Sequence, residues 1–202
     1  MLSSITPLGE RGRRSRWGAT VAIYTVASVA GGLTMGAGAG GVGALLSRIW
    51  WPSVAGVLLL VALASVAAAV LDGGRGHARV PGVHRQVNEE WLRRYRSWVY
   101  ALAFGFQLGL GVITIVTSAA VYLTAAVAFL SASPAVGGMI GAVFGLFRAL
   151  PVLSTWRVAS SSRLQRLHRG LHQLGPTART ATFTLEVAVT AAATGLAIGL
   201  AK

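Results

Sequence analysis

A few polar residues interrupt the long apolar runs of this sequence, and their side chains could do chemistry. Glu186 is the only carboxylate inside such a run, and Arg148 is the only cation deep within one. Gln107, Thr114 and Thr117 share a third run. Because polar groups in lipid are costly, they commonly form ion pairs, proton relays or substrate pathways. We therefore expect these five residues to mark a polar pathway, with Glu186 and Arg148 joined in a salt bridge.

Depth and bonding capacity leave alternatives for these residues. Glu186 and Arg148 each lie about five residues from one end of a run, which is about 7 Å along a helix. Equal depth permits a salt bridge, but a position this shallow also lets both side chains snorkel separately to the headgroups. Thr114 and Thr117 can bond to their own helix backbone, whereas Gln107 needs a partner on another helix or a water.

Signatures of catalysis, cofactor binding and metal binding are absent from the sequence. It has no cysteine, no P-loop, no Ser-His-Asp set and no paired carboxylate within the apolar runs. His168 and His172 have a spacing that could hold a metal, but no acidic or cysteine partner is nearby. We predict that the chain is not an enzyme, that it has no catalytic, cofactor-binding or metal-binding residues, and that it carries no thiol redox chemistry of its own.

The composition is that of an integral membrane protein. Of 202 residues, 54% are hydrophobic and only 11% are charged, with a mean hydropathy of +0.64. A soluble domain has about 25% charged residues. The net charge is +13, and in a membrane protein such an excess marks cytoplasmic segments rather than nucleic-acid binding.

Five apolar runs predict an all-α bundle of about five transmembrane helices in a single domain spanning 1–202. Three basic stretches hold most of the Lys and Arg residues, and we expect all three on the cytoplasmic side of the plasma membrane. The C-terminus is then outside. The runs are 17–46, 52–71, 97–130, 135–153 and 181–201, and the basic stretches are 1–16, 72–96 and 154–180.

The run 97–130 has two interpretations. As one helix it would be about 50 Å long, against a hydrocarbon core of about 30 Å. It is either two short spans or one long span with a kink and an interfacial end. One span keeps the basic stretches 72–96 and 154–180 on the same side, so the positive-inside rule favours it.

Glycines recur at four-residue spacing in most of the runs. This spacing lines them on one helix face, where backbones can approach closely. We expect them to pack helices together, although bending around a substrate pathway is an alternative. The predicted packing residues are Gly32, Gly36, Gly40, Gly105, Gly109, Gly137, Gly141 and Gly145.

An amphipathic helix is predicted over residues 160–175. Leucines at positions 164, 167, 171 and 174 share one face, and Arg and His side chains occupy the rest. Such a helix suits the surface of a bilayer with anionic headgroups, which we expect to be a partner of this chain.

The order of elements resembles the transmembrane family of cytochrome c biogenesis and disulfide-interchange proteins, the CcdA and DsbD type of the LysE-type superfamily. Residues 2–9, with the sequence Leu-Ser-Ser-Ile-Thr-Pro-Leu-Gly, resemble the family's first Pro- and Cys-containing motif. Residues 105–118 resemble the motif helix of its second half. Both motif cysteines are missing, so the electron transfer that the resemblance implies does not carry over. Related exporter-like branches need no cysteine, so a transport function is compatible with this resemblance.

Three classes of function follow. We expect a small-substrate transporter or exporter-like protein acting as a homodimer, because five spans are few for a transporter working alone. The alternative is a non-catalytic membrane subunit or assembly factor that binds a partner protein. An intramembrane enzyme ranks last because the sequence shows no catalytic set.

Overall fold

The computed structural model describes residue 7 and residues 16–73, 96–111, 119–158 and 160–200, and every element in this part of the chain is helical. The α-helices are α2 (Trp17–Leu46), α3 (Val54–Gly73), α5 (Ser97–Leu110), α6 (Ala120–Leu130), α7 (Pro134–Ala149) and α8 (Ser161–Leu200). A 3-10 helix, η1 (Leu150–Arg157), extends α7. The predicted helical membrane bundle is confirmed.

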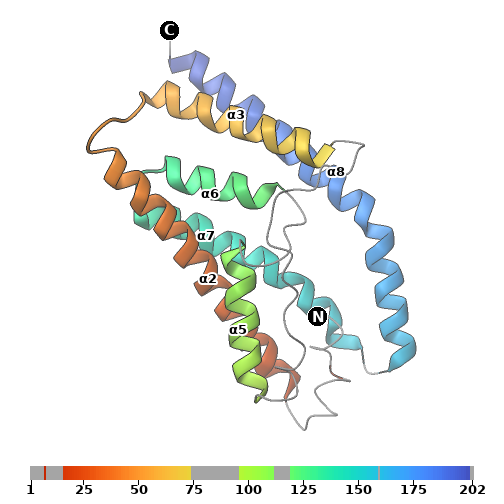
Figure 1. Ribbon diagram of the computed structural model, residues 1–202. Coiled ribbons are helices and arrows are strands. Elements are labelled where there is room, and N and C mark those ends of the chain that lie inside the picture. The colour runs from red at the N-terminus through yellow and green to blue at the C-terminus, as the bar shows by residue number, and fades with distance from the viewer. Residues whose placement is uncertain (1–6, 8–15, 74–95, 112–118, 159, 201–202) are drawn as a thin grey trace.

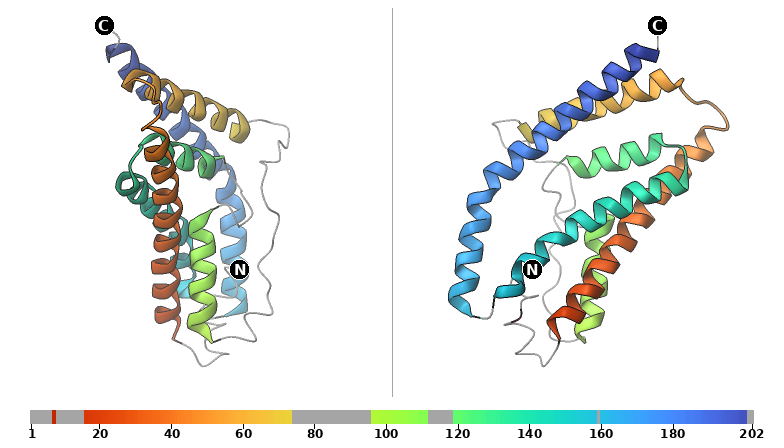
Figure 2. Two further views of the ribbon diagram at one scale, coloured as in Figure 1. Left: turned by 60° about the vertical axis from the view of Figure 1, so that its left-hand side comes forward. Right: turned by 180° about the vertical axis from the view of Figure 1, so that it is seen from behind.

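The helices form two packed groups with α6 between them. In one group α2 packs along α7 and α5, and in the other α3 packs along α8. Figures 1 and 2 show α3 beside the second part of α8, away from the lower ends of α2 and α5. Because α6 contacts α2, α3 and α7, it joins the two groups.

Four helical segments are long and apolar enough to cross a membrane: Trp17–Leu46, Val54–Gly73, Pro134–Trp156 and Gln173–Leu200. The run 97–130 is not one continuous helix, because α5 and α6 have only 14 and 11 residues. A span needs about 20 residues, so neither of these helices can cross alone.

Together, α5 and α6 extend from one end of α2 towards the other (Figure 1). Figure 1 shows α5 starting near the first turns of α2, while α6 ends where α7 begins, at the opposite end of α2. The helix expected in this run is therefore divided, because α5 ends before Gly111 and α6 begins at Ala120.

The half-helix α5 stops at a residue suited to ending a helix. Gly111 follows it with φ +72, and its N–H donates to the carbonyl oxygen of Leu108 at 3.1 Å. Residues other than glycine rarely adopt this φ. At the start of α7, by contrast, the Ser133 hydroxyl accepts from the Val136 N–H and Pro134 fills the first turn.

Helix α8 joins the amphipathic segment to the last apolar run. The helix predicted at residues 160–175 is present as its first part, and α8 continues through Pro176. Figure 1 shows α8 bending between its first part and the part beside α3. Proline has no N–H to donate within a helix, which accounts for a bend near this position.

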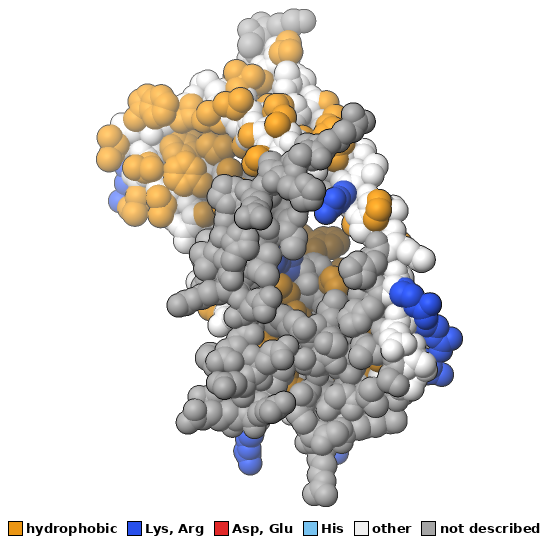
Figure 3. Space-filling view, turned by 45° about the vertical axis from the view of Figure 1, so that its right-hand side comes forward, with side chains coloured by type: hydrophobic (Ala, Val, Ile, Leu, Met, Phe, Trp, Pro, Cys, Tyr) orange, Lys and Arg blue, Asp and Glu red, His pale blue; other side chains and the backbone are white. Residues whose placement is uncertain are grey.

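Apolar and basic side chains occupy different parts of the molecule. Figure 3 shows hydrophobic side chains gathered over its upper part, with most visible Lys and Arg side chains lower down. Exposed arginines on α8 are Arg163, Arg166, Arg169 and Arg179. In the group formed by α2, α5 and α7, the aromatic side chains of Tyr24, Tyr100 and Phe104 are buried in one hydrophobic cluster.

Candidate functional site

Glu186 is buried where α8 packs against α3. Its side chain is 1% exposed, and neither carboxylate oxygen has a hydrogen-bond partner among the described residues. An unsatisfied buried carboxylate is costly in a protein interior and more so inside a membrane. The burial of the Glu186 carboxyl without a hydrogen-bond donor from the described residues makes it a candidate functional group.

Asp72, at the end of α3, is the ionisable neighbour of Glu186. Among the described residues it is the one whose charge acts on the Glu186 carboxyl. One Asp72 oxygen also accepts a hydrogen bond from the Ala119 N–H at 2.8 Å, immediately before α6. A carboxylate at a helix N-terminus is favoured by the helix dipole. Asp72 thus links α3, α8 and the first turn of α6.

This acid pair corrects the expectation that no carboxylates pair within the bundle. The chain has only five Asp and Glu residues, against 18 Lys and Arg residues. The sequence predicts a polar stretch from residue 72 onward, but α3 continues to Gly73 and therefore includes Asp72. The helical end turns this carboxylate towards α6 rather than leaving it in a loop.

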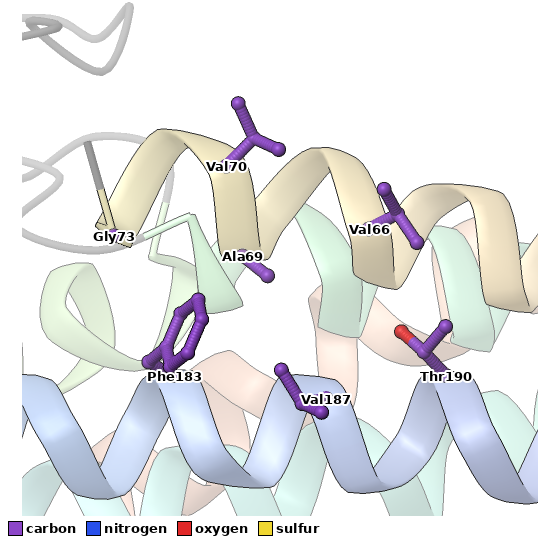
Figure 4. Close-up of a pocket in the computed structure, with 7 residues that line it drawn as sticks. All are labelled: Val66, Ala69, Val70, Gly73, Phe183, Val187 and Thr190. Atoms are coloured by element: carbon purple, nitrogen blue, oxygen red, sulfur yellow. The ribbon is translucent and has the colours of Figure 1, made fainter.

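An apolar groove of about 540 Å³ lies between α3 and α8 beside the acid pair. Figure 4 shows Phe183 and Val187 of α8 pointing towards α3, where Ala69 and Gly73 face them. Thr190 also lines the groove, and its hydroxyl donates to the backbone carbonyl of Glu186 at 2.9 Å. Among the described residues, the groove therefore supplies no hydrogen-bond partner for the Glu186 carboxyl itself.

Gly111, where α5 ends, is enclosed by neighbouring helices. A Cβ on Gly111 would lie 3.0 Å from a methyl carbon of Val121 on α6 and 3.2 Å from the Phe144 ring on α7. Irregular backbone at membrane depth is tolerated where protein buries it or where it lines a cavity. The packing at Gly111 meets the first of these conditions.

The predicted salt bridge between Glu186 and Arg148 is not formed. No described residue donates to the Glu186 carboxylate, and the half-buried Arg148 lies 5.4 Å above the Phe144 ring, near Tyr24. The reason is helix placement, because α8 packs along α3 and no comparable contact joins it to α7. Helices adjacent in sequence are not adjacent here.

The other pathway candidates are only partly described. Gln107 is half-buried in α5, one turn before the break. Thr114 and Thr117 lie outside the described residues.

The predicted packing glycines lie where helices approach closely. A Cβ on Gly32 would overlap the carbonyl oxygen of Gly141, and a Cβ on Gly36 would overlap that of Gly137. Each of the other four positions meets a carbonyl oxygen of a neighbouring segment in the same way. These are Gly40 against Ser133, Gly105 against Tyr24, and Gly109 and Gly145 against Ser28.

Two glycines of α8 behave differently from these eight. A Cβ on Gly195 or Gly199 would have no neighbouring atom within 4 Å. Their four-residue spacing is therefore not used for packing within the described part of the chain.

These features define a polytopic helical membrane protein with four long apolar helical segments and two shorter apolar helices, α5 and α6. Residues 3–198 match the family described as the cytochrome C biogenesis protein transmembrane region. The match covers nearly the whole chain, so this protein belongs to that family, and the resemblance seen in its sequence is confirmed. It is a member without cysteine.

Two curated relatives carry the name methylamine utilization protein MauF. The protein from Methylophilus methylotrophus is 31% identical over 158 residues, which cover 75% of this chain and 53% of the relative. The protein from Paracoccus versutus is 31% identical over 157 residues, covering 74% and 56%. The chain thus spans about half the length of these relatives. No solved structure matches it.

Proposed function

We propose that this protein is a small-substrate transporter or exporter whose pathway runs past the break between α5 and α6. The division of the apolar run 97–130 into the short helices α5 and α6 is the observation that carries the proposal. Discontinuous transmembrane helices are a common way to build substrate sites near the middle of a bilayer. The N-terminus of one half-helix, α6, is already engaged by a carboxylate from α3.

The chemistry of the chain favours movement of a solute over electron transfer. Without cysteine, its own residues offer no thiol to accept electrons. The polar residues near the break are instead Asp72, Glu186 and Gln107, with Thr114 and Thr117 as further candidates from the sequence. Carboxylates and amides inside membrane segments are typical of ion, proton and solute pathways. In this proposal the chain is not an enzyme.

Charge supports an orientation in the plasma membrane with the N-terminus in the cytoplasm. Exposed arginines on the first part of α8 then face the inner leaflet, whose anionic headgroups attract basic segments. This lipid surface is the partner proposed for the basic part of α8.

We place the contact of a homodimer on the open glycine face of α8. Gly195 and Gly199 allow a second helix to approach closely, and no described residue occupies that space. Cysteines introduced singly at Gly195 and Gly199 should cross-link two copies in membranes, whereas one at the lipid-exposed Leu102 of α5 should not. Equal cross-linking at all three positions contradicts this interface.

A second candidate is a non-catalytic subunit that binds a partner protein. The names of the relatives favour it, because both are called methylamine utilization proteins. Purification in mild detergent separates the candidates. A stoichiometric foreign membrane protein supports the subunit, and a homodimer alone supports the transporter.

Accessibility at the break tests the transporter directly. The chain has no native cysteine, so Gln107→Cys and Leu102→Cys can be compared on the same helix without background labelling. A small membrane-impermeant thiol reagent reacts with thiolate formed in water. We expect labelling of Gln107→Cys from at least one side and none of Leu102→Cys. If neither position is labelled from either side, the break is sealed and the transporter proposal fails.

A further inference from the structure

We infer that Asp72 and Glu186 share one proton and form a proton-binding site between α3, α8 and α6. The inference starts from the buried Glu186, whose two oxygens lack a donor from any described residue. If the Glu186 carboxyl is protonated, its own hydrogen replaces the hydrogen-bond donor that the described surroundings lack. Protonated Glu186 can donate to Asp72, and Asp72 also accepts from the Ala119 N–H.

Among the residues that the structure describes, no positive charge lies beside Glu186 to replace such a proton. Helix α8 packs against α3 and η1. Asp72 is the only ionisable side chain of α3, and the last residue of η1 is Arg157. Arg148 lies with Tyr24 and Phe144 instead. The nearest cation on α8 itself is the exposed Arg179, about two turns before Glu186. The one ionisable side chain of α6 is Tyr122. Beside the buried Glu186 and the half-buried Asp72, each negative charge disfavours ionisation of the other carboxyl.

The surroundings fit a proton better than a metal ion. Calcium takes 6–8 oxygen ligands, whereas the groove beside the pair is lined by apolar side chains such as Phe183 and Val187. The Thr190 hydroxyl there is committed to a backbone carbonyl. Within the described residues, no group of three His, Cys, Asp or Glu side chains could hold a metal.

Proton binding at this place acts on the interrupted crossing. With the proton bound, the pair carries one negative charge, which Asp72 presents to the first turn of α6. Loss of the proton leaves two anions between α3 and α8, and their repulsion favours separation of these helices. That the proton drives transport rests on the proposed function above, whereas its presence in the pair does not.

Infrared spectroscopy of the purified full-length protein tests the pair. We expect the C=O stretching band of a protonated carboxyl in the unchanged protein at about pH 7. The band should be lost in Glu186→Gln and kept in Glu10→Gln, the same change outside the pair. Asp72→Asn should shift its frequency, because the acceptor of the Glu186 hydrogen bond becomes a neutral amide. Absence of the band in the unchanged protein, or its persistence in Glu186→Gln, overturns the inference.

Stability at different pH values provides a second measurement on the same proteins. A group that binds a proton only in the folded state makes unfolding easier as pH rises. Between about pH 5 and about pH 8, the melting temperature of the unchanged protein should fall, whereas that of Glu186→Gln should change less. Equal pH dependence of the two proteins contradicts the shared proton.

Added salt and cysteine labelling separate the remaining outcomes. If sodium chloride removes the infrared band and choline chloride does not, the pair holds sodium and the proton assignment is wrong. If the band is present but Gln107→Cys is never labelled, the proton is structural and the transporter proposal alone fails. If Gln107→Cys is labelled but the band is absent, only the proton inference fails.

Discussion

Gly32 on α2 and Gly141 on α7 exclude side chains from each other's positions. A Cβ added to either residue would overlap the carbonyl oxygen of the other. One turn away, the buried Ser28 hydroxyl donates to the carbonyl oxygen of Gly145 at 2.8 Å. Close backbone approach and an interhelical hydrogen bond are two main ways to hold helices together in lipid. The contact between α2 and α7 therefore holds together the two helices against which α5 and α6 pack.

Gly141→Ala should destabilise the protein strongly. The new methyl group meets backbone rather than a movable side chain, and overpacking of this kind costs about 1–3 kcal/mol. Gly38→Ala is the matched control, because a Cβ at Gly38 meets no atom within 4 Å. Thermal unfolding in detergent measures both. Equal melting temperatures for the two variants would show that α2 and α7 are not this close.

Ser28→Ala should have a smaller effect than Gly141→Ala. It removes one interhelical hydrogen bond, which is worth about 0.5–1.5 kcal/mol. Thr34→Ala on the same helix is the control, because the exposed Thr34 hydroxyl bonds only to the Ala30 carbonyl of α2. The same thermal assay ranks them, and a larger loss for Thr34→Ala than for Ser28→Ala argues against the α2–α7 bond.

Glu186→Gln and Arg148→Gln should have independent effects on stability. The two side chains belong to different groups of packed helices, and distant sites usually add within about 0.5 kcal/mol. A double-mutant cycle measured by detergent unfolding gives their coupling. A coupling clearly beyond that limit would restore the salt bridge that the sequence suggested.

The protein should not reduce a disulfide across the membrane by itself. It has no thiol to pass electrons. Vesicles containing the purified protein, with reduced thioredoxin inside and an oxidised acceptor outside, provide the assay. We expect no reduction of the acceptor above that in protein-free vesicles. Thiol-specific reduction without a second protein would contradict this prediction.

The lengths of the apolar runs and the spacing of their glycines predicted the extent of α2 and the faces on which α2 and α7 meet. The apolar run 17–46 coincides with α2, and the four-residue glycine spacing marks the faces that meet at its crossings with α7. These features are local in sequence, because run length sets a span and spacing sets a helix face.

Features that depend on the neighbours of a helix could not be predicted in the same way. The run 97–130 contains three glycines, and only packing shows that Gly105 and Gly109 allow close approach whereas Gly111 ends a helix. The choice of Arg148 as the partner of Glu186 assumed that consecutive helices pack together. Asp72, an acid at the end of an apolar run in a chain of net charge +13, was the available signal for the true neighbour.

The most direct test of the interrupted crossing is the sidedness of the two ends of the α7–η1 segment. Single cysteines at Ser133 and Ser160 are treated in intact cells with an impermeant thiol reagent. One crossing by α5 and α6 together predicts that Ser133→Cys is labelled from outside and that Ser160→Cys is labelled only after permeabilisation. Labelling of Ser160→Cys, but not Ser133→Cys, in intact cells would mean that α5 and α6 cross separately and would contradict this account.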